Sequence, residues 1–94
     1  MAIKSFANVA AEKVFGRERV RSLGPQVSRA ALRKLLMVHA ATSLNDLRVP
    51  PGNRLEALSG DRAGQYSIRV NDQFRVCFRW VDNNAHDVEI VDYH

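Results

Sequence analysis

The chain has 94 residues, 46% of them hydrophobic and 26% charged, which fits one compact soluble domain over residues 1–94 and excludes a second hydrophobic core. No apolar run approaches the roughly 18 residues that cross a bilayer, and the N-terminus lacks the apolar segment of a secretory signal, so we expect a cytoplasmic protein that does not engage membranes. The net charge of +4 favours an anionic partner, and it comes from the first half: residues 1–50 hold nine lysines and arginines against three acids, whereas residues 51–94 hold five against seven.

The N-terminal segment predicts a short strand followed by a helix. Residues 2–6 alternate in character, as a short edge strand does. Asn8 is a favourable helix N-cap, and Gly16 is a favourable stop. We therefore expect a helix over residues 9–15.

A second, longer helix is predicted after a charged connector. The connector, residues 17–21, is either solvated surface or a contact for phosphate or an acidic partner. Pro25 suits the first turn of a helix that runs to about Ala41. Its apolar stripe comprises Val27, Ala31, Leu35 and Val38. His39 lies beside that stripe, and we expect it to be structural.

The second half of the chain changes to the period of β-strands. Residues 43–47 predict a turn or a short helical segment, and the prolines and glycine of residues 50–52 predict a loop. A glycine-bounded turn follows at residues 60–64. Strand patterns cover residues 54–57, 66–70, 74–80 and 88–93. We therefore predict an α+β fold in which the N-terminal helices pack on one face of a twisted antiparallel sheet.

The turn at residues 71–73 determines which side chains share a face of this sheet. A three-residue loop there opposes Arg69 with Arg75 and keeps the large apolar side chains together, whereas a two-residue turn mixes core and surface. The face away from the core then carries Ser67, Arg69, Arg75 and Arg79.

The final strand adds to this face. If its apolar residues join the core, then Glu89, Val91 and Tyr93 lie beside the arginines. One allowed register opposes Arg79 with Glu89 and Arg75 with Tyr93, and a shift of two residues preserves the faces.

Directly opposed arginines are destabilising unless an anion neutralises them. One interpretation is that the long side chains reach solvent with Glu89 as local counterion, which accounts for Arg79 and leaves Arg69 and Arg75 without an evident partner. The other is a face that binds phosphate, for which the planar guanidinium is well suited.

The remaining residue types narrow the chemistry. The three histidines lack the spacing of metal ligands, and no glycine-rich phosphate loop occurs, so we expect neither a metal nor a cofactor. Cys77 is surrounded by apolar residues and is expected to pack. The acid–base groups near the arginines are Glu56, Asp92, Tyr93 and His94. RNA supplies its own nucleophile, the 2′-hydroxyl, so that its cleavage needs a base, an acid and cations.

The stretch LSGDRAGQYSIRVNDQFRVCFRW, followed by the terminal VEIVDYH, resembles the HigB branch of the RelE/ParE toxin superfamily of type II toxin–antitoxin modules. The similarity covers essentially the whole chain. It implies a small helix-plus-twisted-sheet fold and an mRNA endoribonuclease that works on the ribosome, without a metal, by 2′-hydroxyl attack. It also implies a HigA-like helix-turn-helix antitoxin as partner, with operator DNA bound only through the toxin–antitoxin complex.

The resemblance also assigns residues. Arg75 matches the phosphate-facing arginine of the family, and Asp92, Tyr93 and His94 match its C-terminal catalytic group. Some relatives carry a histidine where this chain has Glu56, which is therefore either a base or the partner of an arginine. The candidate catalytic residues are Arg75, Tyr93, His94, Asp92 and Glu56, and the candidate RNA-binding residues are Arg62, Arg69 and Arg79.

Two other functions remain open at this point. A non-catalytic toxin that blocks a protein target such as DNA gyrase, as ParE relatives do, would use the same fold without the terminal acid–base group. A non-toxic RNA-binding module would result if the catalytic set had decayed.

Overall fold

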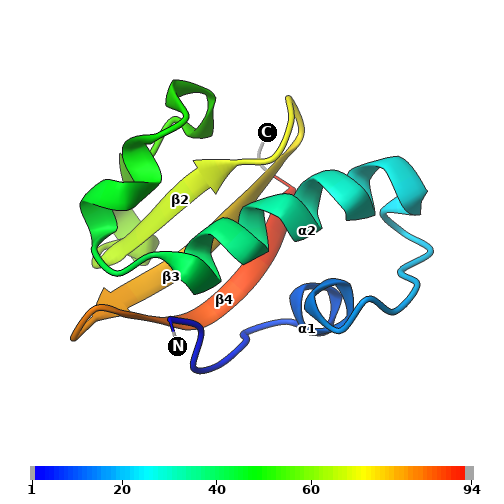
Figure 1. Ribbon diagram of the computed structural model, residues 1–94, viewed down its shortest axis with the longest axis horizontal. Coiled ribbons are helices and arrows are strands. Elements are labelled where there is room, and N and C mark those ends of the chain that lie inside the picture. Colours follow the sequence, from blue (N-terminus) through cyan, green and yellow to red (C-terminus); the bar gives the residue numbers. More distant parts are fainter. Residues whose placement is uncertain (1, 93–94) are drawn as a thin grey trace.

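The computed structural model describes residues 2–92, in which two α-helices pack on one face of a four-stranded antiparallel sheet (Figure 1). The sheet order is β1-β2-β3-β4. The α-helices are α1 (Val9–Phe15) and α2 (Gly24–Ala40), the 3₁₀ segments are η1 (Leu44–Arg48), η2 (Pro51–Asn53) and η3 (Gly60–Arg62), and the strands are β1 (Glu56–Ala57), β2 (Gln65–Arg69), β3 (Phe74–Val81) and β4 (Asn84–Asp92). The predicted α+β class is confirmed. Within residues 2–92, no helix has the length and hydropathy to span a bilayer.

Helix α1 begins and ends where its capping residues predict. The Asn8 side chain accepts a hydrogen bond from the Ala11 N–H at 3.0 Å, and the Gly16 N–H donates to the Glu12 carbonyl at 3.0 Å. Asn8 also donates to the Ile90 carbonyl at 2.9 Å, which ties the start of α1 to β4. One side chain therefore both caps the helix and docks it on the sheet.

Replacing Asn8 with alanine should lower the free energy of unfolding by about 1–2 kcal/mol, because the α1 cap and the contact to β4 are lost together. Chemical denaturation measures the change. Asn45→Ala is the matched control, since the Asn45 amide makes an exposed contact to Arg48 within η1, and a change below about 0.5 kcal/mol is expected there. Equal changes for the two variants would contradict the docking role of Asn8.

The predicted N-terminal edge strand is not formed. Residues 2–6 instead make two isolated parallel bridges to β4, Ile3 with Ala85 and Phe6 with Val88. The physical reason lies in β4, where Asp87 adopts a left-handed conformation (φ 53°) and interrupts the regular spacing of hydrogen-bonding groups between the bridges. The Asp87 N–H donates to the Ser5 hydroxyl at 2.9 Å instead.

Helix α2 covers one face of the sheet and forms the core with it. The predicted stripe is buried at Ala31, Leu35 and Val38 and half-buried at Val27. These side chains pack over β3 and β4, where Val76, Phe78 and Val88 are fully buried. Burying a side chain such as Leu35 contributes roughly 2 kcal/mol to stability. With this face occupied by the core, the other face of the sheet is left for other roles.

A short connecting segment joins α2 to the sheet. The predicted turn or helical segment at residues 43–47 is η1, which Ser43 and Asp46 close with a capping box. The Asp46 carboxylate accepts hydrogen bonds that hold its pKa below the usual range, and the largest contribution comes from the Thr42 N–H.

The register between β2 and β3 is the predicted one. Arg69 opposes Arg75, Ile68 opposes Val76, and the Val70 N–H donates to the Phe74 carbonyl across a loop of residues 71–73. The three-residue loop keeps the apolar side chains on the α2 side of the sheet, as expected.

Of the β3–β4 registers that the sequence allows, the structure has the one shifted by two residues over the part of β4 nearest its end, and the predicted faces are preserved there. Arg75 opposes Val91, a shift of two residues, and Arg79 opposes His86. The pairing changes by one residue between Cys77 and Arg79 because β4 carries a bulge, with Asp87 in its left-handed conformation.

Candidate active site

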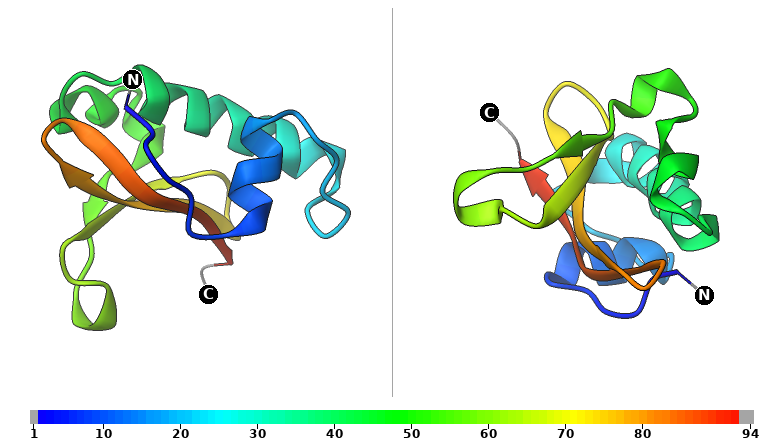
Figure 2. Two further views of the ribbon diagram at one scale, coloured as in Figure 1. Left: turned by 90° about the horizontal axis from the view of Figure 1, so that it is seen from below. Right: turned by 90° about the vertical axis from the view of Figure 1, so that its left-hand side faces the viewer.

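Five of the candidate residues lie on the sheet face that α2 leaves open: Glu56, Arg62, Arg69, Arg75 and Arg79. Asp92 opposes Phe74 and therefore lies on the other face, as strand parity predicts. Figure 2 shows that η3 and the loop around it lie on the opposite side of the sheet from α2. From η3, Arg62 reaches across and pairs with Glu89 of β4. Cys77, which opposes Glu89, is buried, and desolvation raises the pKa of its thiol, as expected of a packing residue.

Arg75 is the most constrained charged side chain on this face. It is 8% exposed, and three groups surround its guanidinium. Nε donates to the Ser67 hydroxyl at 2.8 Å, and Nη2 donates to the Arg54 carbonyl at 2.6 Å. Nη1 lies 3.6 Å from the Glu56 carboxylate. The expectation that Arg75 has no evident partner is therefore wrong.

The other arginines on this face also have carboxylate partners, and these come from turns and from the bulge. Arg69 pairs with Asp72, which lies in the turn that follows β2. Arg79 pairs with Asp87 at 3.3 Å, so the expected pairing of Arg79 with Glu89 is wrong. Glu89 lies opposite Cys77 and is engaged by Arg62 instead. These pairs are partly exposed, and each contributes only about 0–1 kcal/mol, which a phosphate can outcompete.

A polar hollow of about 170 Å³ lies at the β2–β3 turn. It brings together three predicted residues, Arg75, Glu56 and Arg69, and its full lining is Arg54, Glu56, Arg69, Asn71, Asp72, Gln73 and Arg75. Arg62 and Arg79 lie outside this lining. The hollow has room for a phosphate group and is lined by three arginines and two carboxylates.

The terminal acid–base group begins beside this hollow. Asp92 opposes Phe74 at the end of β4 and accepts a hydrogen bond from the Gln73 side chain at 3.0 Å. Tyr93 and His94 lie outside the described residues, and their assignment remains a prediction from the sequence.

Sequence reasoning missed two groups that hold this site in place. Asn53 is fully buried, donates to the Leu47 carbonyl at 3.2 Å and accepts from Lys34 Nζ at 2.6 Å. Desolvation is the largest cause that lowers the pKa of Lys34. Arg54, directly after Asn53, is left-handed (φ 47°) and presents its carbonyl to Arg75. The prolines and glycine of residues 50–52 predicted a loop here, but nothing local in the sequence indicated the burial of Asn53.

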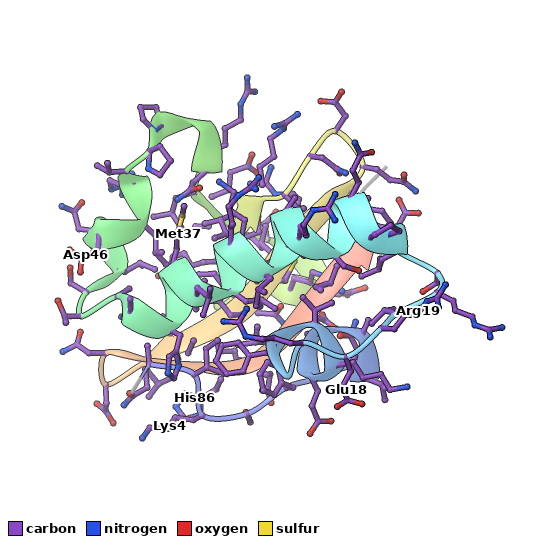
Figure 3. The ribbon with its side chains drawn as sticks, turned by 45° about the vertical axis from the view of Figure 1, so that its right-hand side comes forward. Lys4, Glu18, Arg19, Met37, Asp46 and His86 are labelled. Atoms are coloured by element: carbon purple, nitrogen blue, oxygen red, sulfur yellow. The ribbon has the colours of Figure 1, made fainter. Side chains whose placement is uncertain are left out.

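A second basic surface lies on the helical side of the molecule. Its six members are exposed and, among residues 2–92, none of them forms an ion pair: Lys13, Arg17, Arg19, Arg21, Arg29 and Arg33. Figure 3 shows Arg19 extending outward from the α1–α2 connector, at the opposite end of the molecule from Asp46. We call these six residues the helical basic surface. A hollow of about 510 Å³ lies among several of them and the start of α2.

No metal centre is indicated in the part of the chain that the structure describes, since no three His, Cys, Asp or Glu side chains there are grouped to hold an ion. His39 instead packs edge-on against Phe15, with ring centroids 5.1 Å apart. The structural role predicted for His39 agrees with this packing.

Comparison with known proteins identifies the family. A family model described as "RelE-like toxin of type II toxin-antitoxin system HigB" matches residues 4–94. Toxin HigB-1 of Vibrio cholerae is 47% identical over 68 residues, 72% of each chain. Endoribonuclease HigB of Proteus vulgaris is 27% identical over 92 residues, 98% of this chain and 99% of that one. Among solved structures, a YoeB-YefM complex from Staphylococcus aureus matches with a TM-score of 0.63 at 16% identity, covering 100% of this chain and 99% of that one, a likeness of fold.

Proposed function

The chain belongs to the HigB-like family of RelE-like toxins of type II toxin–antitoxin systems, and we propose that it is an endoribonuclease that cleaves mRNA on the ribosome. The observation that carries this proposal is Arg75, a nearly buried arginine held at the edge of a polar hollow. It opposes Val91, two residues before Tyr93 in the sequence. A guanidinium fixed in advance at such a hollow suits the stabilisation of charge on a reacting phosphate.

The proposed reaction uses the 2′-hydroxyl of the substrate as nucleophile. A base takes the proton of this hydroxyl, the O2′–P bond forms, the P–O5′ bond breaks, and an acid protonates the departing 5′ oxygen. The products are a 2′,3′-cyclic phosphate and a 5′-hydroxyl end. Arg75 stabilises the pentacoordinate phosphate, and Tyr93 and His94 supply proton transfer. Asp92, which opposes Phe74 on the other face of the sheet, orients the chain end.

The helical basic surface supports a large anionic partner such as the ribosome. Its six cations have no acidic partner among residues 2–92, whereas Arg62, Arg69, Arg75 and Arg79 are each paired. Unpaired cations gain most from phosphate, since no internal ion pair has to break. The second proposed partner is a HigA-like antitoxin, a choice that rests on the family and on the toxin–antitoxin complex among its fold neighbours.

Mapping of transcript ends after induction without antitoxin tests the function. We expect new 5′-hydroxyl ends within translated codons, and none in the same RNA when translation initiation is blocked. Growth arrest with intact transcripts would favour the blocking of a protein target such as DNA gyrase. Harmless high-level expression would favour an RNA-binding module without catalysis.

The location of Glu56 favours the role of counterion over that of general base. Its carboxylate lies 3.6 Å from Arg75 Nη1, on the side that a phosphate would approach. We expect Glu56→Gln to bind ribosomes programmed with a 2′-deoxy codon about two- to fivefold more tightly and to keep its cleavage rate within about threefold, because one exposed ion pair no longer competes with phosphate.

Asp61→Asn is the control for this substitution. Asp61 is an exposed acid of η3, and its replacement removes the same negative charge. Little change in affinity is expected for it. A loss of about a hundredfold or more in the cleavage rate of Glu56→Gln, with unchanged binding, would instead make Glu56 the base.

A further inference from the structure

We propose that Ser67, together with the main-chain carbonyl of Arg54, is a positioning group that holds Arg75 for its contact with the scissile phosphate. This inference rests on the proposed function, because it assigns the cause of the orientation of Arg75. Ser67 touches the arginine and acts through it.

Ser67 is built into the sheet where it reaches Arg75. It lies in β2, is fully buried, and opposes Glu56 in β1 and Cys77 in β3. Arg75 is its diagonal neighbour on the same face, so the arginine side chain runs across β2 toward β1. The hydrogen bond from Nε to the Ser67 hydroxyl, 2.8 Å long, is buried. A buried hydroxyl that accepts from a charged donor fixes the plane of the guanidinium.

The second acceptor, the Arg54 carbonyl, is fixed independently of the sheet. The left-handed conformation of Arg54 ends η2, and its N–H donates to the Pro51 carbonyl at 3.1 Å. Asn53, one residue earlier, is anchored to Lys34 of α2 and to the Leu47 carbonyl. The position of the Arg54 carbonyl is therefore set from the helical layer, and that of the Ser67 hydroxyl from the sheet.

The two acceptors receive their hydrogen bonds from the same edge of the guanidinium. Nε and Nη2 form that edge, and each donates to one of them. Nη1 then points toward Glu56 and the polar hollow, where an anion can approach. The Arg75 side chain thus loses its rotamer freedom on folding and not on binding substrate. No further entropy cost of ordering it then opposes stabilisation of the transition state.

Ser67→Ala tests this role in two independent ways. On ribosomes programmed with a cleavable codon, we expect kcat to fall about tenfold with KM changed by less than about twofold, since an orientation needed in the transition state is lost. In an Arg75→Ala background, the same substitution should have no further effect on kcat. A merely structural role of Ser67 would lower the activity of both backgrounds by similar factors.

The second measurement does not need activity. In protein labelled with ¹⁵N-arginine, the Nε–H signal of Arg75 should exchange with water at least about tenfold faster in Ser67→Ala than in the unchanged chain. Cys77→Ala is the control, because it also removes a buried atom from this face, and both exchange and kcat should stay within about twofold. Thermal unfolding confirms that each variant is folded.

The outcomes separate this inference from the proposed function. Unchanged exchange at Arg75 Nε, or unchanged kcat with faster exchange, overturns the positioning role. Equal effects of Ser67→Ala with and without Arg75 also overturn it. If the protein without substitutions cleaves no RNA, both the proposed function and the catalytic purpose of holding Arg75 are refuted. The exchange measurement still decides whether Ser67 holds Arg75.

Discussion

Arg75→Ala is expected to lower the single-turnover cleavage rate of ribosome-bound mRNA by about a thousandfold, because the main source of positive charge at the reacting phosphate is removed. Binding to ribosomes should change much less, since the helical basic surface is untouched. The substitution also deprives the buried Ser67 hydroxyl and the Arg54 carbonyl of their donors. We therefore expect a loss of roughly 1–3 kcal/mol in the free energy of unfolding, which calls for assays well below the unfolding transition.

Two further variants make this test specific. Arg75→Lys keeps the charge but loses the planar donor edge, and we expect cleavage to fall about a hundredfold. Arg48→Ala is the matched control, because Arg48 is an exposed arginine of η1 that contacts Asn45, and its rate should stay within about twofold. Full activity in folded Arg75→Ala would remove Arg75 from the mechanism.

The elements of the fold that could be predicted are those with local causes. Helix α1 has its bounds at the predicted residues because Asn8 and Gly16 each act within one helical turn. The loop of residues 71–73 was predictable because a one-residue slip would have moved the apolar side chains out of the core. In contrast, the bulge at Asp87 has no signature in the sequence. The hydrophobic pattern of β4 is compatible with the β3–β4 pairing on either side of the extra residue.

The site was predictable only in part, for the same reason. Strand parity brought Arg69 and Arg75 to one face, and the structure places them there. Their partners depend on long-range contacts: Glu56 arrives through β1, and the Arg54 carbonyl through the anchoring of Asn53 to α2. Such contacts join segments about 20 residues apart, and no sequence period records them.

These partners change how the arginine face should be understood. A face of unpaired arginines would bind any nucleic acid strongly, whereas carboxylates beside Arg69, Arg75 and Arg79 compete with phosphate. Binding at the site then depends on a phosphate that is presented at the right place, and general attraction is left to the helical basic surface. This division is what we expect if the proposed enzyme acts on mRNA that the ribosome already holds.

Removal of the hydroxyl group of Tyr93 is expected to have the second largest effect. Strand parity predicts Tyr93 on the face of Arg75, and among the terminal residues it is the one that combines an ionisable hydroxyl with an aromatic ring. We expect Tyr93→Phe to lower the single-turnover cleavage rate about a hundredfold through lost proton transfer. Tyr93→Ala should lower it about a further tenfold, because stacking on an unpaired base is lost as well.

The comparison of these two variants separates the roles of the hydroxyl and the ring. If Tyr93 acts by stacking alone, Tyr93→Phe retains nearly full activity while Tyr93→Ala does not, and the proton-transfer role is then refuted. Tyr66→Phe is the matched control, since Tyr66 packs its ring near Phe78 in the sheet with centroids 6.4 Å apart, and its rate should stay within about twofold. A pH–rate profile adds a check that stacking cannot imitate: the limb that belongs to the Tyr93 hydroxyl should vanish in Tyr93→Phe, and its persistence would assign that proton to another member of the terminal group.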